Sequence, residues 1–130
     1  MNNDKIFSVK RKVVAHEIDE LQHVNNVVYV QWVQDIAKQH WEVLTKDHKL
    51  DDVVWVLIRH EIDYKNQAVL DDEVTVKTWV GETAGVTSVR YVESYKGTTL
   101  LTKSKTTWCL LDAKTFKPTR INDAIKNLMI

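Results

Sequence analysis

Residues 17–44 read EIDELQHVNNVVYVQWVQDIAKQHWEVL and contain the one long helical pattern of the chain. Apolar side chains recur there at intervals of three and four residues, which places them on one side of an α-helix. This apolar stripe consists of Tyr29, Trp32, Val33, Ile36, Ala37, Trp41 and Leu44. Asn25 and Asn26 precede the stripe, and their side chains can accept hydrogen bonds from the free N–H groups of a first turn. We therefore predict a central helix that begins near Asn26.

Three titratable residues, Glu17, Asp19 and His23, lie just before the predicted helix start. A helix N-terminus offers free N–H donors and a partial positive charge, and both stabilise an oxyanion. Together with a carboxylate and an imidazole, it provides the groups needed to polarise a carbonyl and to attack it. The same residues also fit a structural interpretation, in which Asp19 caps a turn and His23 is an ordinary loop residue.

Composition describes one ordinary domain over residues 1–130, with 44% hydrophobic and 28% charged residues. Eighteen basic residues balance 18 acidic ones, so the net charge does not indicate binding to nucleic acid or to an anionic membrane. The single cysteine, Cys109, fits a reducing compartment. Because no apolar run approaches about 18 residues, we expect no membrane insertion and a cytoplasmic protein.

Five segments have the β-branched content or the alternation of strands, namely 6–16, 53–64, 73–80, 86–95 and 98–111. The three glycines, Gly81, Gly85 and Gly97, lie between predicted strands and indicate hairpins of an antiparallel sheet. Six consecutive apolar residues at the start of 53–64 predict that both faces of that strand are covered. A short helix is predicted at 121–128. One helix and an antiparallel sheet make an α+β fold.

The segment from Asp19 to Tyr29, DELQHVNNVVY, resembles the D-x-x-x-H-V-N-N-x-x-Y signature of hotdog-fold thioesterases. This superfamily is typified by 4-hydroxybenzoyl-CoA thioesterase and the plant acyl-ACP thioesterases, and the resemblance extends over most of the chain. It implies a hotdog fold, an antiparallel sheet wrapped around one long helix. The implied function is an acyl-CoA thioesterase of fatty acid metabolism that releases free acid and CoA. An acyl-ACP thioesterase and a non-catalytic module that binds acyl thioesters are the alternatives.

The resemblance also implies roles for individual residues. Asp19 would be the catalytic carboxylate, as nucleophile or as general base, and His23 would orient water or substrate. The backbone N–H near Asn26 would polarise the thioester carbonyl. The chain departs from relatives at three places. Glu17 stands in place of the aspartate of many relatives, Gln22 in place of a glycine, and Gln67-Ala68 in place of the Glu-Cys pair of the plant enzymes. No metal or redox cofactor is needed for this chemistry.

Substrate contacts are expected along the helix and the strands. Tyr29, Trp32 and Val33 are candidate walls of an acyl tunnel, and Arg90 is a candidate for the ligand's phosphates. Arg59 either lines the substrate channel or pairs with an acid such as Glu61. Because a lone helix covers one face of a sheet, we expect a homodimer or homotetramer. The resemblance implies that the active site lies at the subunit interface.

Overall fold

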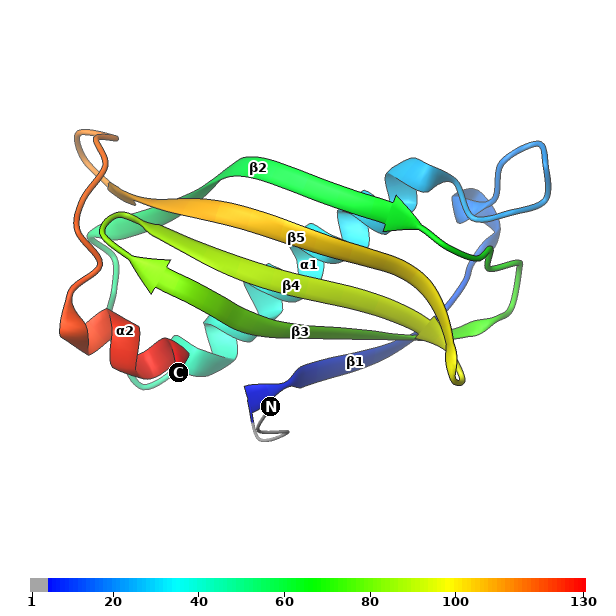
Figure 1. Cartoon of the computed structure of the whole chain (residues 1–130), viewed down its shortest axis with the longest axis horizontal. Helices are drawn as coiled ribbons and strands as arrows, with labels where there is room; N and C mark the ends of the chain where they lie inside the picture. The colour runs from blue at the N-terminus through cyan, green and yellow to red at the C-terminus, as the bar shows by residue number, and fades with distance from the viewer. Residues whose placement is uncertain (1–4) are drawn as a thin grey trace.

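A five-stranded antiparallel sheet wraps around one long helix in the computed structural model, which describes residues 5–130 (Figure 1). The elements in chain order are β1 (Phe7–Lys12), the 3-10 helix η2 (Ala15–Glu17), α1 (Asn26–Thr45), β2 (Val53–Tyr64), β3 (Glu73–Ala84), β4 (Thr87–Lys96), β5 (Thr99–Asp112) and α2 (Asp123–Met129). The predicted α+β hotdog architecture is confirmed.

The strands lie in the order β1-β3-β4-β5-β2. Strands β3, β4 and β5 form a meander through two hairpins, and Gly85 and Gly97 adopt positive φ angles of 64° and 59° in the two turns. Strand β1 adds to one edge beside β3, and β2 adds to the other edge beside β5. Helix α1 crosses behind this sheet in Figure 1, so one face of the sheet is packed and the other faces solvent.

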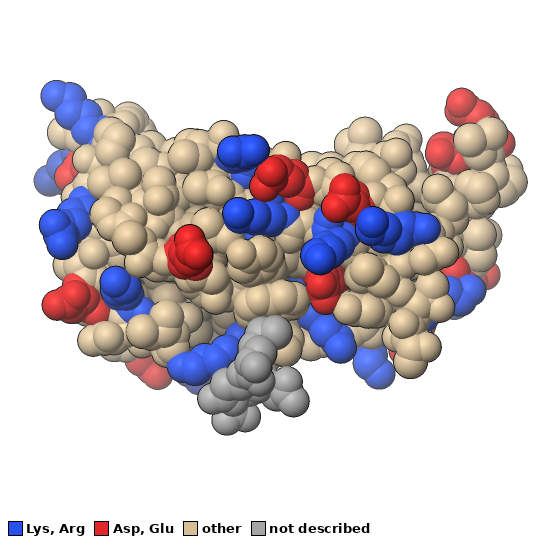
Figure 2. Space-filling model, viewed as in Figure 1, with Lys and Arg blue, Asp and Glu red and all other residues tan. Residues whose placement is uncertain are grey.

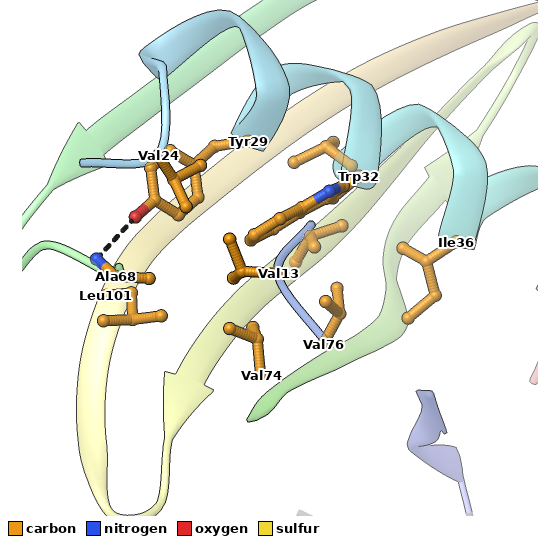
Figure 3. Packing of buried hydrophobic residues seen from close by; sticks show 11 residues of the cluster. Val13, Val24, Tyr29, Trp32, Ile36, Ala68, Val74, Val76 and Leu101 are labelled. Carbon is orange, nitrogen blue, oxygen red and sulfur yellow. Dashed lines mark hydrogen bonds between the residues drawn. The ribbon is translucent and has the colours of Figure 1, made fainter. Parts of the chain in front are cut away.

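The main core lies between α1 and the sheet (Figure 3). Tyr29, Trp32 and Ile36 point from the helix towards Val74 and Val76 of β3, and all five are at most 3% exposed. These helix residues belong to the apolar stripe that the sequence indicated. A second cluster under α2 contains Leu110, Ile121, Ile125 and Met129. The sequence prediction of a helix at 121–128 is therefore confirmed within two residues at its start.

Gly81 is not a turn residue, in contrast to the sequence prediction. Strand β3 continues through it to Ala84, and the register with β4 shifts between Val80 and Thr83. A Cβ atom at position 81 would lie 2.6 Å from Cε2 of Tyr91, so the side chain is missing because an aromatic ring occupies its space.

Strand β2 also differs from the prediction that both of its faces are covered. Val54, Val56 and Ile58 are 40%, 39% and 57% exposed. The reason is topological, because β2 is an edge strand that pairs only with β5. An apolar row beside an unpaired strand edge therefore remains open in the single chain.

Charges of both signs alternate on the sheet face that points away from α1 (Figure 2). Exposed ion pairs between strands or turns include Lys10 with Glu73 at 3.8 Å and Lys12 with Asp71 at 3.5 Å. This face therefore presents no patch of a single sign. Within residues 5–130, no helix combines the length and the apolar character needed to cross a membrane.

Candidate active site

Helix α1 begins at Asn26, as the sequence predicted, and Asn25 is its N-cap. The Asn25 side chain accepts a hydrogen bond from the Val27 N–H at 3.1 Å, and its backbone oxygen accepts one from the Val28 N–H at 2.9 Å. The Asn26 N–H donates to no acceptor in residues 5–130. A free N–H at the positive end of a helix is suited to hold an oxygen on which negative charge develops.

A tight loop carries Asp19 and His23 to the start of α1. The Asp19 N–H donates to the His23 oxygen at 2.9 Å, and the Asn25 N–H donates to the Glu17 oxygen at 2.9 Å. The chain reverses at Gln22, which has a left-handed φ of 66°. A glycine adopts this conformation without steric cost, which explains its presence in many relatives. The loop is thus fixed directly to the residue that caps the helix.

The Asp19 carboxylate uses only one of its oxygens in the loop. Oδ1 accepts from the Leu21 N–H at 2.9 Å and, at 3.4 Å, from the His23 N–H. Oδ2 accepts no hydrogen bond from residues 5–130. The side chain is half-buried. Asp19 therefore caps a turn, as the structural interpretation held, and it keeps a second oxygen available for chemistry.

Glu17 is a buried anchor under this loop. Its Oε1 accepts from the Val14 N–H at 3.0 Å, and its Oε2 accepts from Trp32 Nε1 at 3.1 Å and pairs with Arg11. Burial raises the pKa of the carboxyl, but the hydrogen bonds from Val14 and Trp32 and the Arg11 cation outweigh it and lower the pKa below its usual value. Glu17 therefore ties the loop to α1 and β1 as a charged group.

A cavity of about 540 Å³ lies farther along α1, between the helix and strands β2, β4 and β5. Its polar wall includes Gln31, Gln34 and Lys38 of α1, and its apolar wall contains Trp41, Trp55 and Trp108. Asp19, His23 and Asn26 do not line it. The nearest lining residue on the helix is Gln31, about 8 Å along the axis from Asn26 at 1.5 Å per residue.

Arg90 extends from β4 into the space between the sheet and α1. It is 6% exposed, and its Nη1 lies 2.7 Å from His40 Nδ1 and 3.1 Å from Thr78 Oγ1. Burial lowers the pKa of Arg90 to about 10, so the group remains a cation at neutral pH. Burial and the Arg90 cation lower the pKa of His40 to about 4. His40 is therefore neutral at pH 7 and accepts the Arg90 hydrogen bond through Nδ1.

The residues expected to contact substrate lie in three different environments. Tyr29, Trp32 and Val33 are at most 3% exposed, belong to the core, and do not line the cavity. Arg59 is exposed and forms an ion pair with Glu61 at 3.1 Å, which is the alternative to a place in the substrate channel. Arg90 does line the cavity. The structure thus places Asp19, His23 and Asn26 in one loop and the helix start that follows it, and it places Arg90, on β4, beside His40 farther along α1.

Sequence reasoning missed His40 and the tryptophans of the cavity. A signal existed for His40, because it follows Ile36 by four residues and Ala37 by three and so continues the buried stripe. A histidine on such a stripe needs a polar partner. Nothing in the local sequence indicates that Arg90, 50 positions away, provides it. In the described part of the chain, His, Cys, Asp and Glu side chains do not gather in a group of three that could hold a metal ion.

The sheet around one central helix is the architecture of the hotdog-fold thioesterases, and this resemblance is confirmed by sequence and structure comparisons. Residues 4–129 match the family described as the acyl-ACP thioesterase N-terminal domain, and the chain belongs to this family. Among curated proteins no sequence matches.

Several solved structures share the fold at low sequence identity. A predicted thioesterase from Bacillus stearothermophilus is 23% identical with a TM-score of 0.84, over 95% of this chain and 93% of that one. The 1,4-dihydroxy-2-naphthoyl-CoA thioesterase from Synechocystis is 14% identical with a TM-score of 0.82, over 95% of each chain. The 12:0-ACP thioesterase from Umbellularia californica is 16% identical with a TM-score of 0.81, over 94% of this chain but 48% of its own.

The anchoring role of Glu17 predicts a large loss of stability in the Glu17→Ala variant. Removal of the carboxylate leaves the Arg11 cation and the Trp32 N–H without their acceptor, and breaking a buried pair in this way costs about 3 kcal/mol. Urea unfolding followed by circular dichroism measures the loss. Glu20→Ala, at an exposed position of the same loop, should change stability by less than about 0.5 kcal/mol. Equal effects of the two substitutions would contradict the anchoring role.

The lowered pKa of His40 predicts a loss of stability between pH 6.5 and pH 4. In this window the unfolded chain binds a proton at His40 and the folded chain does not, so acid favours unfolding. The contribution is at most about 1.4 kcal/mol per pH unit. His40→Asn keeps an acceptor for Arg90 but does not titrate, and its stability should fall less steeply through this window. The exposed control His48→Asn should show the same change of unfolding free energy with pH as the wild type. An equally steep change in His40→Asn would refute the prediction.

Proposed function

We propose that the protein is a thioester hydrolase that converts an acyl-CoA to the free acid and CoA. The observation that carries the proposal is the free Asn26 N–H at the start of α1, next to Asn25, whose own N–H bonds the Glu17 backbone oxygen at 2.9 Å and so fixes the helix start to the loop of Asp19 and His23. These are the donor and the base that addition to a carbonyl requires. Membership of a thioesterase family supports the same chemistry.

In the proposed reaction the thioester carbonyl oxygen accepts the Asn26 N–H. Asp19 Oδ2 either removes a proton from water, which then attacks the carbonyl carbon, or attacks that carbon itself. The C–S bond breaks when the tetrahedral intermediate collapses, and the CoA thiolate leaves and takes up a proton. Direct attack by Asp19 gives an anhydride that water then hydrolyses. His23, on the same loop, orients the water or the substrate.

The carrier of the acyl group separates two candidate substrates. The family match favours an acyl-ACP as the alternative substrate. An acidic carrier protein would need a basic docking surface, whereas the sheet face away from α1 mixes both signs (Figure 2). This face therefore does not provide the basic docking surface that an acyl-ACP substrate would need. Parallel assays with the same acyl group on CoA and on ACP distinguish the two.

We further propose that two copies pair through β2, with the active site at their interface. Strand β2 has an unpaired edge and an exposed apolar row of Val54, Val56 and Ile58, and the cavity beside it is lined partly by exposed residues of α1. A second copy is the fitting partner for this edge, because it presents the same unpaired strand edge and the same apolar row. Isologous pairing would bury both rows. A homotetramer would add a second interface to this one.

The Asp19→Asn variant tests the catalytic proposal. The amide oxygen still accepts the loop hydrogen bonds, but the group can neither act as a base nor attack, so we expect hydrolysis to fall by about 10²–10⁴-fold. Thiol release from short, medium, long and aromatic acyl-CoAs measures the effect, and the exposed Asp47→Asn is the matched control. Ligand binding should survive. Unchanged turnover in Asp19→Asn would contradict the role of Asp19 as base or nucleophile. Binding without hydrolysis in the wild type would show a non-catalytic module instead.

The Ile58→Asp variant tests the pairing through β2. Ile58 is the most exposed member of the apolar row, and a carboxylate there cannot be buried without a partner. The variant should therefore have the mass of a single chain in light scattering, whereas the wild type should have that of two or more. Phe116→Asp replaces a side chain that is 68% exposed and lies outside the strands. It should leave the oligomer intact. A dimeric Ile58→Asp would place the interface elsewhere.

A further inference from the structure

Arg90 is a buried cation without a buried anion. It is 6% exposed, and none of the ion pairs in the described part of the chain includes it. The groups that contact it, His40 and Thr78, are neutral. Burial of an uncompensated charge costs several kcal/mol, so a fold retains it only where something offsets the cost. Neither the core nor the proposed hydrolysis at Asp19 accounts for a guanidinium at this place.

The unused donors of Arg90 face the cavity. Nη1 makes both of the hydrogen bonds to His40 and Thr78, which leaves Nε and Nη2 without a partner in residues 5–130. These two atoms are not among the fully enclosed polar atoms that lack a partner, which are Arg11 Nε and His60 Nε2. Arg90 lines the cavity, so its Nε and Nη2 are open to it. These N–H groups lie on one edge of the guanidinium and form the fork that binds a carboxylate bidentately.

His40 holds that fork in place. Its Nδ1 accepts from Arg90 Nη1, and its ring stacks on Phe7 with 5.0 Å between centroids and 7° between planes. A neutral imidazole orients the cation but does not neutralise it. The site therefore has a fixed cation whose binding edge remains free for a ligand.

The rest of the cavity is complementary to an apolar ligand with an anionic end. Lys38 adds a second cation to the polar wall, and the one carboxylate in the lining, Asp35, accepts a hydrogen bond from Gln31 Nε2 at 2.8 Å. Trp41, Trp55 and Trp108 provide the apolar wall. A simple alkyl chain would pack against these tryptophans but would leave the Nε and Nη2 donors of the buried Arg90 without an acceptor from the ligand.

We propose that this cavity selects an acyl group that carries a carboxylate at the end remote from the thioester, and that Arg90 binds this carboxylate. The proposed substrate class is thus an ω-carboxyacyl thioester, whose hydrolysis yields a dicarboxylic acid. This inference rests on the proposed thioester hydrolysis for its catalytic consequence. The recognition of a carboxylate by Arg90 is a separate property that binding alone can test.

The first test compares hydrolysis of matched CoA thioesters that differ only in the terminal group. The pairs are sebacoyl with decanoyl and hexadecanedioyl with palmitoyl. Long chains are used because Arg90 bonds to His40, which lies about 21 Å along the helix axis from Asn26 at 1.5 Å per residue. For at least one chain length, the wild type should prefer the ω-carboxy member by about tenfold or more in kcat/KM, the effect of one charge-assisted hydrogen bond pair. Arg90→Met should abolish the preference, so that the two members of each pair are hydrolysed with equal kcat/KM. Arg90→Lys should retain part of the preference for the ω-carboxy member. The exposed control Arg120→Met should retain all of this preference.

The second test measures binding without turnover. Three of the five tryptophans line the cavity, so tryptophan fluorescence reports its occupation. Adipate and sebacate should bind the wild type more tightly than hexanoate and decanoate, and Arg90→Met should lose the difference while its melting curve still shows a folded protein. Arg90-dependent binding of dicarboxylates without hydrolysis of any thioester would support the inference and overturn the proposed function.

Equal binding and turnover of both members of every pair by the wild type would overturn the inference, whatever the activity of the protein. This is also the outcome expected if a carboxylate of a second copy occupies Arg90. A preference that persists unchanged in folded Arg90→Met would overturn it as well.

Discussion

One helix has to cover a sheet that is wider than itself, and the rest of the structure follows from this constraint. Helix α1 is about 30 Å long and about 10 Å wide, whereas five strands at about 4.8 Å spacing span about 20 Å or more. The apolar stripe packs on the sheet in the main core, with Val74 and Val76 of β3 and Leu101 of β5. Packing is incomplete farther along the helix, where the cavity and the buried Arg90 lie between α1 and the sheet, and the edge of β2 stays open. The sites where a ligand and a second copy could bind are the parts where this packing is incomplete.

Much of the fold was predictable because its signals are local. The helical period, the two turn glycines and the β-branched runs located α1 and most strand boundaries within a few residues. Gly81 was misassigned because the ring that excludes its side chain, that of Tyr91, lies on the neighbouring strand. The exposure of β2 was also missed, since strand order across a sheet is not a local property. The same limit applies to the site: the loop of Asp19 is continuous in sequence, but the pair of His40 and Arg90 exists only after the sheet has formed.

Two of the departures from relatives lie in the loop before α1 and have physical explanations there. Glu17 is longer than the aspartate of many relatives, and its carboxylate reaches Trp32 Nε1 in the core and Arg11 on β1. Gln22 adopts a conformation that glycine adopts at lower cost, so the loop stores a small strain. Both residues act on the position of the loop, and the carboxylate of Asp19 retains its free oxygen. The proposed chemistry at the helix N-terminus is therefore compatible with both departures.

The most direct measurement is a crystal structure of the protein with an acyl-CoA analogue in which a methylene group replaces the thioester sulfur. This ligand keeps the carbonyl and cannot be hydrolysed. We predict that the carbonyl oxygen lies within about 3 Å of the Asn26 backbone nitrogen, with Asp19 Oδ2 facing the carbonyl carbon directly or through one water. A carbonyl bound away from the start of α1, with Asp19 remote from it, would contradict the proposed hydrolysis.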